Sequence, residues 1–161
     1  MTSDSVRLGA DLVLDRVRPD EIPVLTRLKR ASYAPWLPIL GLEPLPYRAD
    51  YGAVLADHEA WFARDAAGTE IGALVLGFPD DHVLIWSVAV AASTSRRGIG
   101  RALLDFAEAE AIRRGLDEVR LYTNALMARN IALYLSLGYD ETGRETTLDG
   151  RQVVHMAKRV A

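Results

Sequence analysis

The stretch VLIWSVAVAASTSRRGIGRALL, residues 83–104, joins an apolar run to a turn rich in glycine and arginine, and then to an apolar helix. The run at residues 83–90 is nearly continuous in apolar side chains, which is typical of a central strand buried on both faces. Gly98 and Gly100 have no Cβ, so they let main-chain amides approach a ligand closely. Unpaired amides and the positive end of the helix dipole meet where the helix begins. The stretch therefore predicts a strand, an anion-binding turn and a helix.

Predicted strands and helices continue on both sides of this stretch. Hydrophobic periodicity and the positions of glycine and proline predict strands at residues 12–17, 59–65, 69–78, 117–123, 139–147 and 151–160. The same signals predict helices at residues 19–32, 48–57, 98–114 and 127–139. Four prolines and a glycine make residues 33–46 a poor helix or strand, so we expect an ordered loop there. The order of elements predicts an α/β protein with a mixed sheet and helices on both faces.

Length and composition predict one globular domain over residues 1–161, with residues 1–8 flexible. A net charge of -3 lacks the broad basic face that nucleic-acid binding requires, so we expect no nucleic-acid partner. No segment approaches the roughly 20 apolar residues that span a bilayer, and the N-terminus has no long apolar stretch, so we expect no membrane partner and no signal peptide. The absence of cysteine excludes disulfides and a cysteine nucleophile and fits a cytoplasmic protein.

The glycine turn differs from two familiar phosphate-binding motifs. A P-loop requires Gly-Lys-Ser/Thr after four residues, and a dinucleotide fingerprint requires glycine where Leu103 stands. The segment SRRGIGRALL, residues 95–104, instead resembles the motif of the GNAT acetyltransferase superfamily, which is Arg/Gln-x-x-Gly-x-Gly/Ala before a long helix. The alternative is a tight strand-to-helix crossover with solvated arginines beside it.

The resemblance implies a single GNAT-like domain with a mixed, mostly antiparallel sheet that binds acetyl-CoA. In the family, amides of this turn hold the pyrophosphate while the preceding strand pairs with pantetheine. By position, the resemblance implies that pantetheine lies along Val88, Ala89 and Val90. It implies that the pyrophosphate lies at Ser95, Arg96, Arg97, Gly98, Ile99, Gly100 and Arg101. Ser95 departs from the family's usual arginine or glutamine, and Arg96 or Arg97 is expected to supply the missing charge.

A second segment, LYTNALMARNIALYLSLGY at residues 121–139, resembles the family's region where a short helix carries a tyrosine before Leu-Gly-Phe/Tyr. Tyr134 takes that position, and the resemblance implies that it protonates the departing thiolate. A phenol of pKa about 10 and a thiol of about 8.5 are close enough for such a transfer. The alternative is an aromatic side chain that only packs. Many members have asparagine where this chain has Met127, so we expect Asn130 to contact pantetheine instead.

No general base is evident from the residues. The acceptor must be a neutral amine, and deprotonating a lysine-like amine at neutral pH costs on the order of 4 to 5 kcal/mol. Related sequences often carry a glutamate where this chain has Trp86 and Ser87. The acidic turn at residues 80–82 is a candidate that acts through water, and a solvated turn is its alternative. A backbone amide near Val88 can polarise the thioester carbonyl, which leaves catalysis mostly to positioning.

The proline-rich loop resembles the family's acceptor-side loop. The predicted acceptor contacts are Tyr33, Trp36 and, on the central strand, Trp86. Their character favours a hydrophobic or amphipathic acceptor, and burial in the core or a dimer interface is the alternative. Three scattered histidines without HExxH spacing predict no metal.

Together the two motifs predict an acyl-CoA-dependent N-acyltransferase that moves the acetyl group of acetyl-CoA directly to a primary amine. The acceptor is expected to be a small molecule or a peptide, and the protein a monomer or a homodimer. The alternatives are a non-catalytic acyl-CoA-binding sensor or interaction module, and a nucleotide or phosphometabolite site at the same turn. Ser95 and the missing glutamate motivate the sensor.

Overall fold

The computed structural model describes residues 4–9, 11–91 and 98–161, so the predicted contacts of Ser95, Arg96 and Arg97 lie outside the described residues. Its strands are β1 (Ser5–Arg7), β2 (Val13–Arg16), β3 (Glu59–Arg64), β4 (Glu70–Gly77), β5 (Val83–Val90), β6 (Glu118–Asn124), β7 (Asp140–Thr146) and β8 (Gln152–Arg159). Its α-helices are α1 (Ile22–Tyr33), α2 (Leu37–Leu40), α3 (Leu45–Arg48), α4 (Tyr51–Val54), α5 (Ile99–Arg113) and α6 (Ala128–Ser136). The 3-10 helices η1 (Pro19–Glu21) and η2 (Ala34–Trp36) precede α1 and α2.

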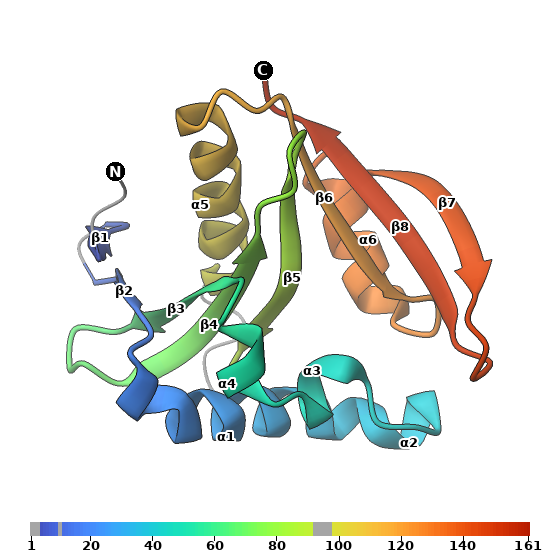
Figure 1. Cartoon of the computed structure of the whole chain (residues 1–161), viewed down its shortest axis with the longest axis horizontal. Coiled ribbons are helices and arrows are strands. Elements are labelled where there is room, and N and C mark those ends of the chain that lie inside the picture. Colours follow the sequence, from blue (N-terminus) through green and yellow to red (C-terminus); the bar gives the residue numbers. More distant parts are fainter. Residues whose placement is uncertain (1–3, 10, 92–97) are drawn as a thin grey trace.

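The strands form one sheet in the order β1-β2-β3-β4-β5-β6-β8-β7 (Figure 1). Neighbouring strands are antiparallel except β5 and β6, which are parallel. One face packs against α5 and α6 in the larger core cluster, and the other packs against α1 and α4 in a smaller one. The prediction of a mixed, mostly antiparallel sheet with helices on both faces is therefore confirmed.

The prediction that residues 33–46 form an ordered loop, and neither a helix nor a strand, is wrong, because short helices occupy much of this segment. Each of η2, α2 and α3 has a proline in its first turn, where the missing N–H has no helical partner to lose. Gly41, at a φ of 70°, ends α2 in a left-handed conformation. The prolines therefore start new helical turns and keep each helix short.

The sheet also begins earlier than the sequence predicts. Residues Ser5–Arg7, within the stretch expected to be flexible, form the edge strand β1. They pair with β2, with Val6 opposite Leu14. No strand was expected there, because three residues are too short to show a periodic pattern.

The central strand β5 changes partners along its length. It pairs with β4 from Leu84 to Val90, but with β6 only from Val83 to Ile85. The register with β4 shifts by one residue at Trp86, so β5 carries a bulge there. A bulge bends a strand and re-aims the side chains beyond it. Beyond the bulge, Val88 joins the core cluster on the α5 side, while Ser87 bonds a side chain of α1. In Figure 1, β5 and β6 lie together at one end and separate toward the other.

Candidate active site

Two adjoining cavities lie where β5 and β6 separate, and together they form one cleft. Both are lined by Tyr33, Val88, Met127, Asn130 and Tyr134. The α5-side cavity is also lined by Ala31, Ser32, Pro35, Trp36, Ala89, Val90, Gly98, Gly100, Arg101, Leu104, Arg129 and Leu133. The β6-side cavity is also lined by Pro44, Leu45, Pro46, Ile85, Trp86, Ser87, Leu121, Tyr122, Thr123, Asn124, Arg151 and Val153.

The α5-side cavity has the properties of an anion site. Gly98 precedes α5 at a φ of 73°, which favours glycine. A Cβ on Gly100 would lie 3.7 Å from Val90 Cγ2, an ordinary contact, so the protein's own packing does not demand glycine there. Arg101 and Arg129 line the cavity, and its described lining contains no carboxylate. The helix N-terminus and two guanidiniums therefore favour a negatively charged ligand.

The exposed edge of β5 forms one wall of this cavity. From Trp86 to Val90, the edge that faces β6 has no strand partner among the described residues. The Val88 and Val90 carbonyls accept hydrogen bonds from the hydroxyls of Tyr33 and Ser32, at 3.4 and 3.5 Å. A strand edge without a neighbouring strand can pair with an extended ligand that carries amides. A pantetheine arm has that chemistry, so the residues present fit acetyl-CoA.

Most of the predicted cofactor residues meet at this cavity. Lining it are Val88, Ala89, Val90, Gly98, Gly100, Arg101 and Asn130. The side chain of Ile99 lies instead in the core, with its Cγ2 3.3 Å from the position of a Cβ on Gly72. Sequence reasoning missed Arg129, whose guanidinium lies 5.7 Å from the centre of the Trp36 ring.

Tyr134 lies where the two cavities join. Its ring packs edge-on against Tyr139, with the ring centroids 6.1 Å apart. Burial, and secondarily the phenol of Tyr33, raises the pKa of Tyr134, so the phenol stays protonated through the neutral range. In the part of the chain that the structure describes, its hydroxyl has no hydrogen-bond partner. It can therefore donate its proton to a ligand.

A buried lysine lies behind the cleft. Lys29, on α1, is 0% exposed, and its Nζ donates to Ser87 Oγ at 2.8 Å and to the Ala73 carbonyl at 3.3 Å. Ser87 Oγ lies 3.3 Å from the Tyr33 hydroxyl, which donates to the Val88 carbonyl at 3.4 Å. Burial lowers the pKa of Lys29 to about 7. Ser87 and Tyr33 connect this amine to the β6-side cavity.

Sequence reasoning missed Lys29, although a signal was present. Leu25, Lys29 and Tyr33 are spaced by four residues and lie on one face of α1. Leu25 and Lys29 are the residues of α1 that are fully buried. A lysine at a core position of a helical pattern, without a neighbouring acid, is uncommon enough to notice.

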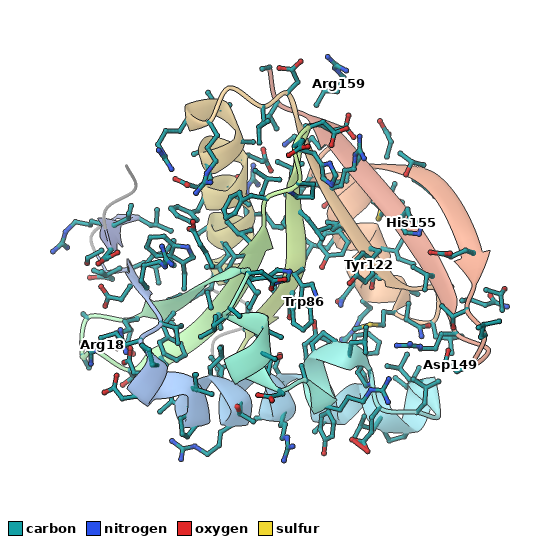
Figure 2. The ribbon with its side chains drawn as sticks, viewed as in Figure 1. Arg18, Trp86, Tyr122, Asp149, His155 and Arg159 are labelled. Atoms are coloured by element: carbon teal, nitrogen blue, oxygen red, sulfur yellow. The ribbon has the colours of Figure 1, made fainter. Side chains whose placement is uncertain are left out.

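The predicted acceptor residues divide between the two cavities. Trp86 lines the β6-side cavity, Trp36 lines the α5-side cavity, and Tyr33 lines both. Figure 2 shows Trp86 on β5 and Tyr122 on β6, two strands that border the β6-side cavity. In its described lining Arg151 carries the one formal charge, and the other side chains are apolar or neutral. This cavity suits a largely apolar molecule without extra positive charges.

The acidic turn at residues 80–82 lies outside both cavities. There Asp81 Oδ1 bonds His82 Nδ1 at 2.6 Å, and a second oxygen of Asp81 lies 3.6 Å from Arg120. The described residues contain no group of three or more side chains placed to hold a metal ion. They also contain no helix long and apolar enough to cross a membrane.

Residues 25–139 match the model of the acetyltransferase (GNAT) family. A similar curated protein is the [ribosomal protein bS18]-alanine N-acetyltransferase of Escherichia coli K12, 40% identical over 76 residues. The matched region spans 45% of this chain and 51% of that relative, about half its length.

Solved structures show the same fold. The ribosomal-protein-S18-alanine N-acetyltransferase of Escherichia coli has a TM-score of 0.74 at 20% identity and covers 93% of this chain and 94% of its own. The PaiA N-acetyltransferase of Thermoplasma acidophilum, in complex with coenzyme A, has a TM-score of 0.75 at 17% identity and covers 93% and 99%. At these identities the likeness is one of fold.

Proposed function

Because the chain belongs to the acetyltransferase (GNAT) family, we propose that it transfers the acetyl group of acetyl-CoA directly to a primary amine in the cleft between β5 and β6. One observation carries the proposal. A carboxylate-free cavity with an open strand edge and two arginines joins a second, largely apolar cavity at a protonated tyrosine. A sensor needs the first cavity alone, whereas a transferase needs both and a proton donor between them.

The cofactor arm of the proposal assigns parts of acetyl-CoA to the α5-side cavity. The pantetheine amides pair with the edge of β5 that faces β6, along Val88, Ala89 and Val90, and Asn130 contacts them from α6. The phosphates lie at Gly98, Gly100 and Arg101, with the amide of Ile99 and the predicted contacts of Ser95, Arg96 and Arg97. Arg129, on α6, adds a second cation to the lining. These contacts bind and orient the thioester at the junction of the cavities.

In this proposal Tyr134 is the general acid. The attacking nitrogen forms a bond to the acetyl carbon while the carbon–sulfur bond breaks. The phenol then gives its proton to the departing sulfur and regains one from the new amide nitrogen. A general acid of this kind contributes about 100-fold or more to the rate. A buried phenol that stays protonated suits the role.

The acceptor arm assigns the amine to the β6-side cavity. Tyr33, Trp86 and the apolar wall favour a primary amine with a hydrophobic or amphipathic body. The single guanidinium, Arg151, and the lack of a carboxylate in the described lining disfavour a polycation. Small molecules and peptides with an apolar N-terminal residue both fit.

The remaining expectations also belong to the proposal. The enzyme acts in the cytoplasm as a monomer or a homodimer, without a metal, and residues 1–161 form a single domain. The absence of cysteine supports a reducing compartment.

Turnover of a panel of amines tests the function, with release of the CoA thiol as the readout. The panel pairs apolar amines, such as phenylalaninamide, with the polycation spermidine. We expect the wild-type protein to acetylate apolar amines. In Tyr134→Phe we expect kcat to be about 100-fold lower and the Kd of acetyl-CoA to be unchanged. Tyr139→Phe, a neighbour outside both cavity linings, is the matched control for loss of a hydroxyl. Full turnover by Tyr134→Phe removes the assigned role, and saturable CoA binding without turnover of any amine favours the sensor.

A pair of glycine variants tests the cofactor arm. Gly100→Ala is compatible with the free protein and replaces a helical glycine, so we expect it to keep or raise the melting temperature while weakening acetyl-CoA binding. Gly98→Ala forces a Cβ into a left-handed conformation and costs about 1 to 2 kcal/mol of stability. Calorimetry with acetyl-CoA, ATP and NAD measures binding. Undiminished CoA binding by Gly100→Ala, or stronger binding of ATP or NAD, contradicts the assignment.

A further inference from the structure

Lys29 is a buried amine that the proposed mechanism does not yet use. Its Nζ lies behind the cleft and reaches it through Ser87, on the strand that carries the bulge. We infer that Lys29, acting through Ser87, receives the proton that the acceptor ammonium must lose before it attacks the thioester. The inference rests on the proposed acetyl transfer and adds to it the missing path for a proton. Lys29 is a positioning residue in this scheme, because Ser87 is the group that faces the acceptor.

The surroundings of Lys29 favour its neutral form. Its hydrogen-bond partners are a hydroxyl and a carbonyl, and it makes no ion pair with any described residue. The segments outside the description, residues 1–3, 10 and 92–97, contain no aspartate or glutamate. No carboxylate side chain therefore compensates the charge that an ammonium would carry here. A charge buried without a partner is costly, so the group loses its proton instead.

The titratable groups around Lys29 are uncharged in the neutral range. Tyr33 follows it on α1, and Tyr51, Tyr122 and Tyr134 approach Tyr33 from α4, β6 and α6. Burial raises the pKa of all four phenols. Arg151 is the one charged side chain in the described lining of the β6-side cavity. Burial alone lowers the pKa of Lys29 to about 7, with no charged neighbour contributing.

Ser87 supplies the link between the amine and the cavity. Its side chain is 4% exposed and lines the β6-side cavity, while its Oγ lies 2.8 Å from Lys29 Nζ. A hydroxyl both donates and accepts, so it can pass its own proton to Nζ and take one from the acceptor nitrogen. The Tyr33 hydroxyl, 3.3 Å from Ser87 Oγ, holds that hydroxyl in place.

The protons balance over one turnover. The acceptor ammonium gives one proton to Ser87, Ser87 gives one to Lys29, and the amine becomes a nucleophile. The nitrogen–carbon bond forms, the carbon–sulfur bond breaks, and Tyr134 protonates the sulfur and regains a proton from the new amide. Lys29 holds the remaining proton and returns it through Ser87 to water when the products leave. A proton acceptor works best when its pKa lies near the working pH, and Lys29 meets that condition.

A direct titration of Lys29 is the first part of the test. The chain contains two lysines, Lys29 and Lys158. Protein labelled with lysine carrying ¹³C at Cε therefore gives two signals in NMR spectra, and Lys29→Met assigns them. Lys158, bonded to Glu108 at 2.8 Å, is the internal reference for a charged lysine. We expect the Lys29 signal to titrate in the neutral range. A Lys29 signal that does not change in the neutral range overturns the inference without affecting the proposed acetyl transfer.

The pH dependence of kcat/KM, with an amine that the panel shows to be acetylated, is the second part. The wild-type rate is expected to fall as pH drops through the pKa of Lys29. Lys29→Met removes the proton acceptor, and Ser87→Ala removes the hydroxyl that connects it to the cavity. In both variants this fall of kcat/KM at low pH should be absent, and the rate at pH 7 should be about 100-fold lower. Both should recover much of the loss on a weakly basic amine such as trifluoroethylamine, which is already neutral. Lys158→Met is the matched control and keeps the wild-type profile.

A purely structural lysine gives a different result. It would lower kcat equally at every pH and for every amine, and circular dichroism would show reduced stability. Folded Lys29→Met or Ser87→Ala protein that keeps the wild-type limb overturns the inference while acetyl transfer stands. A wild-type protein that acetylates no amine removes the proposed function itself, a failure that the titration does not depend on.

Discussion

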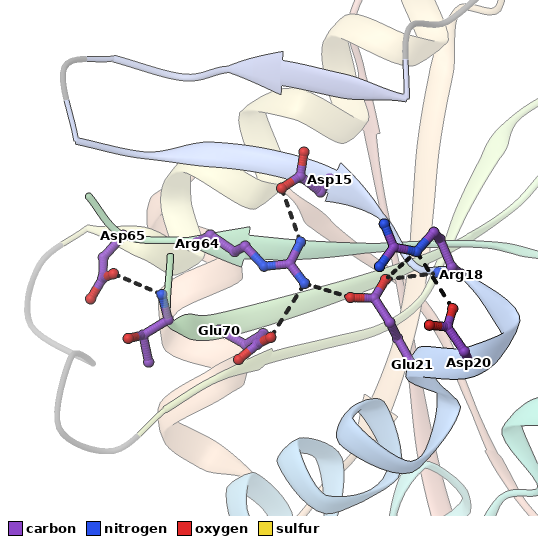
Figure 3. A network of polar contacts seen from close by, with 8 residues as sticks. Asp15, Arg18, Asp20, Glu21, Arg64, Asp65 and Glu70 are labelled. Carbon is purple, nitrogen blue, oxygen red and sulfur yellow. Dashed lines mark hydrogen bonds and ion pairs between the residues drawn. The ribbon is translucent and has the colours of Figure 1, made fainter. Parts of the chain in front are cut away.

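Two cations in this protein are held in opposite ways. Arg64, on β3, contacts three carboxylates, as Figure 3 shows. Lys29, on α1, contacts none among the described residues. Both are shielded from water, Lys29 completely and Arg64 with a side chain 17% exposed. The two cations differ in whether nearby carboxylates compensate their positive charge. This compensation decides whether a buried cation stabilises the fold or can exchange a proton.

The Arg64 network joins four elements. Its Nη1 donates to Asp15 of β2 at 2.9 Å, and its Nη2 donates to Glu21 of η1 at 2.7 Å and Glu70 of β4 at 3.2 Å. Burial, which by itself would lower the pKa of Arg64, is outweighed by these hydrogen bonds, so that pKa is raised. Burial by itself would raise the pKa of Asp15. Hydrogen bonds with Ser5 and Arg64 outweigh that effect, so the pKa of Asp15 is lowered. Arg64 and Asp15 are therefore both held in their charged forms.

The Lys29 site lacks each of these features. The hydrogen-bond partners of Lys29 are neutral, and burial is the sole cause of its lowered pKa. One of these partners, the Ser87 hydroxyl, lies in the lining of the cleft. A guanidinium also holds its proton far more firmly than an amine does. The comparison teaches that a compensated arginine fixes elements together, while an uncompensated lysine remains titratable at neutral pH.

The largest expected effect is on the pH dependence of stability in Lys29→Met. Unfolded Lys29 keeps its proton up to its ordinary pKa of 10.5, but folded Lys29 loses it near 7. Between these values the unfolded state binds more protons, so raising the pH stabilises the wild-type fold by about 1.4 kcal/mol per unit. The stability of Lys29→Met relative to wild type should therefore fall by about 3 kcal/mol between pH 7 and 9.5. Urea unfolding at several pH values measures it, and a constant difference contradicts the shifted pKa.

The next largest effect is the loss of stability in Arg64→Met. In this variant three carboxylates lose the cation that they share. Because these ion pairs are partly buried, the loss of unfolding free energy should lie between that of a surface pair and that of a buried pair, at about 2 kcal/mol at pH 7. The folded pKa of Asp15 is lowered, so this stabilisation is present above the unfolded value and is lost as the pH falls through the folded one. The gap between variant and wild type should therefore close below about pH 4. Urea unfolding at pH 7 and in acid measures the gap, and one of equal size in acid contradicts the charge pairing.

A carboxylate placed beside Lys29 should make it resemble Arg64. In Ser87→Asp, the new acid lies next to Nζ and is expected to raise the pKa of Lys29 by about 1 unit or more, equivalent to roughly 1.4 kcal/mol. The NMR signal of labelled Lys29 reports the change, and acetyl transfer at pH 7 should be lost. Ser87→Asn is the matched control without the charge. An unchanged titration in Ser87→Asp shows that compensation is not what separates the two sites.

The smallest expected effect is that of removing one carboxylate from the Arg64 network. Glu70 makes the longest of the three contacts and is partly exposed, so Glu70→Gln should lower the unfolding free energy by less than about 1 kcal/mol. Thermal unfolding at low and high salt measures the change, and salt should reduce it. A loss of unfolding free energy as large as that of Arg64→Met contradicts the view that all three carboxylates contribute to the stabilisation by Arg64.

Much of the fold could be predicted from the sequence because its signals are local. The apolar run at residues 83–90 predicted a central strand, and the periodic apolar residues at 98–114 predicted a long helix. The structure confirms both. The short helices at residues 34–48 were missed because proline density hides single turns. The contact of Trp36 with the α5-side cavity was also missed, since it depends on how η2 lies against α6.

The sequence by itself determined the sheet's central strand, the glycine turn that precedes α5, and the position of Tyr134 on its helix. Each depends on residues that are neighbours in the chain, where spacing alone carries the information. The tertiary structure alone decided that Lys29 meets Ser87, 58 residues away, behind the cleft. Among the described residues, it also brought three acids to Arg64 and none to Lys29. A pKa depends on solvation and on charges nearby in space, so neither cation's chemistry can be derived from the order of residues.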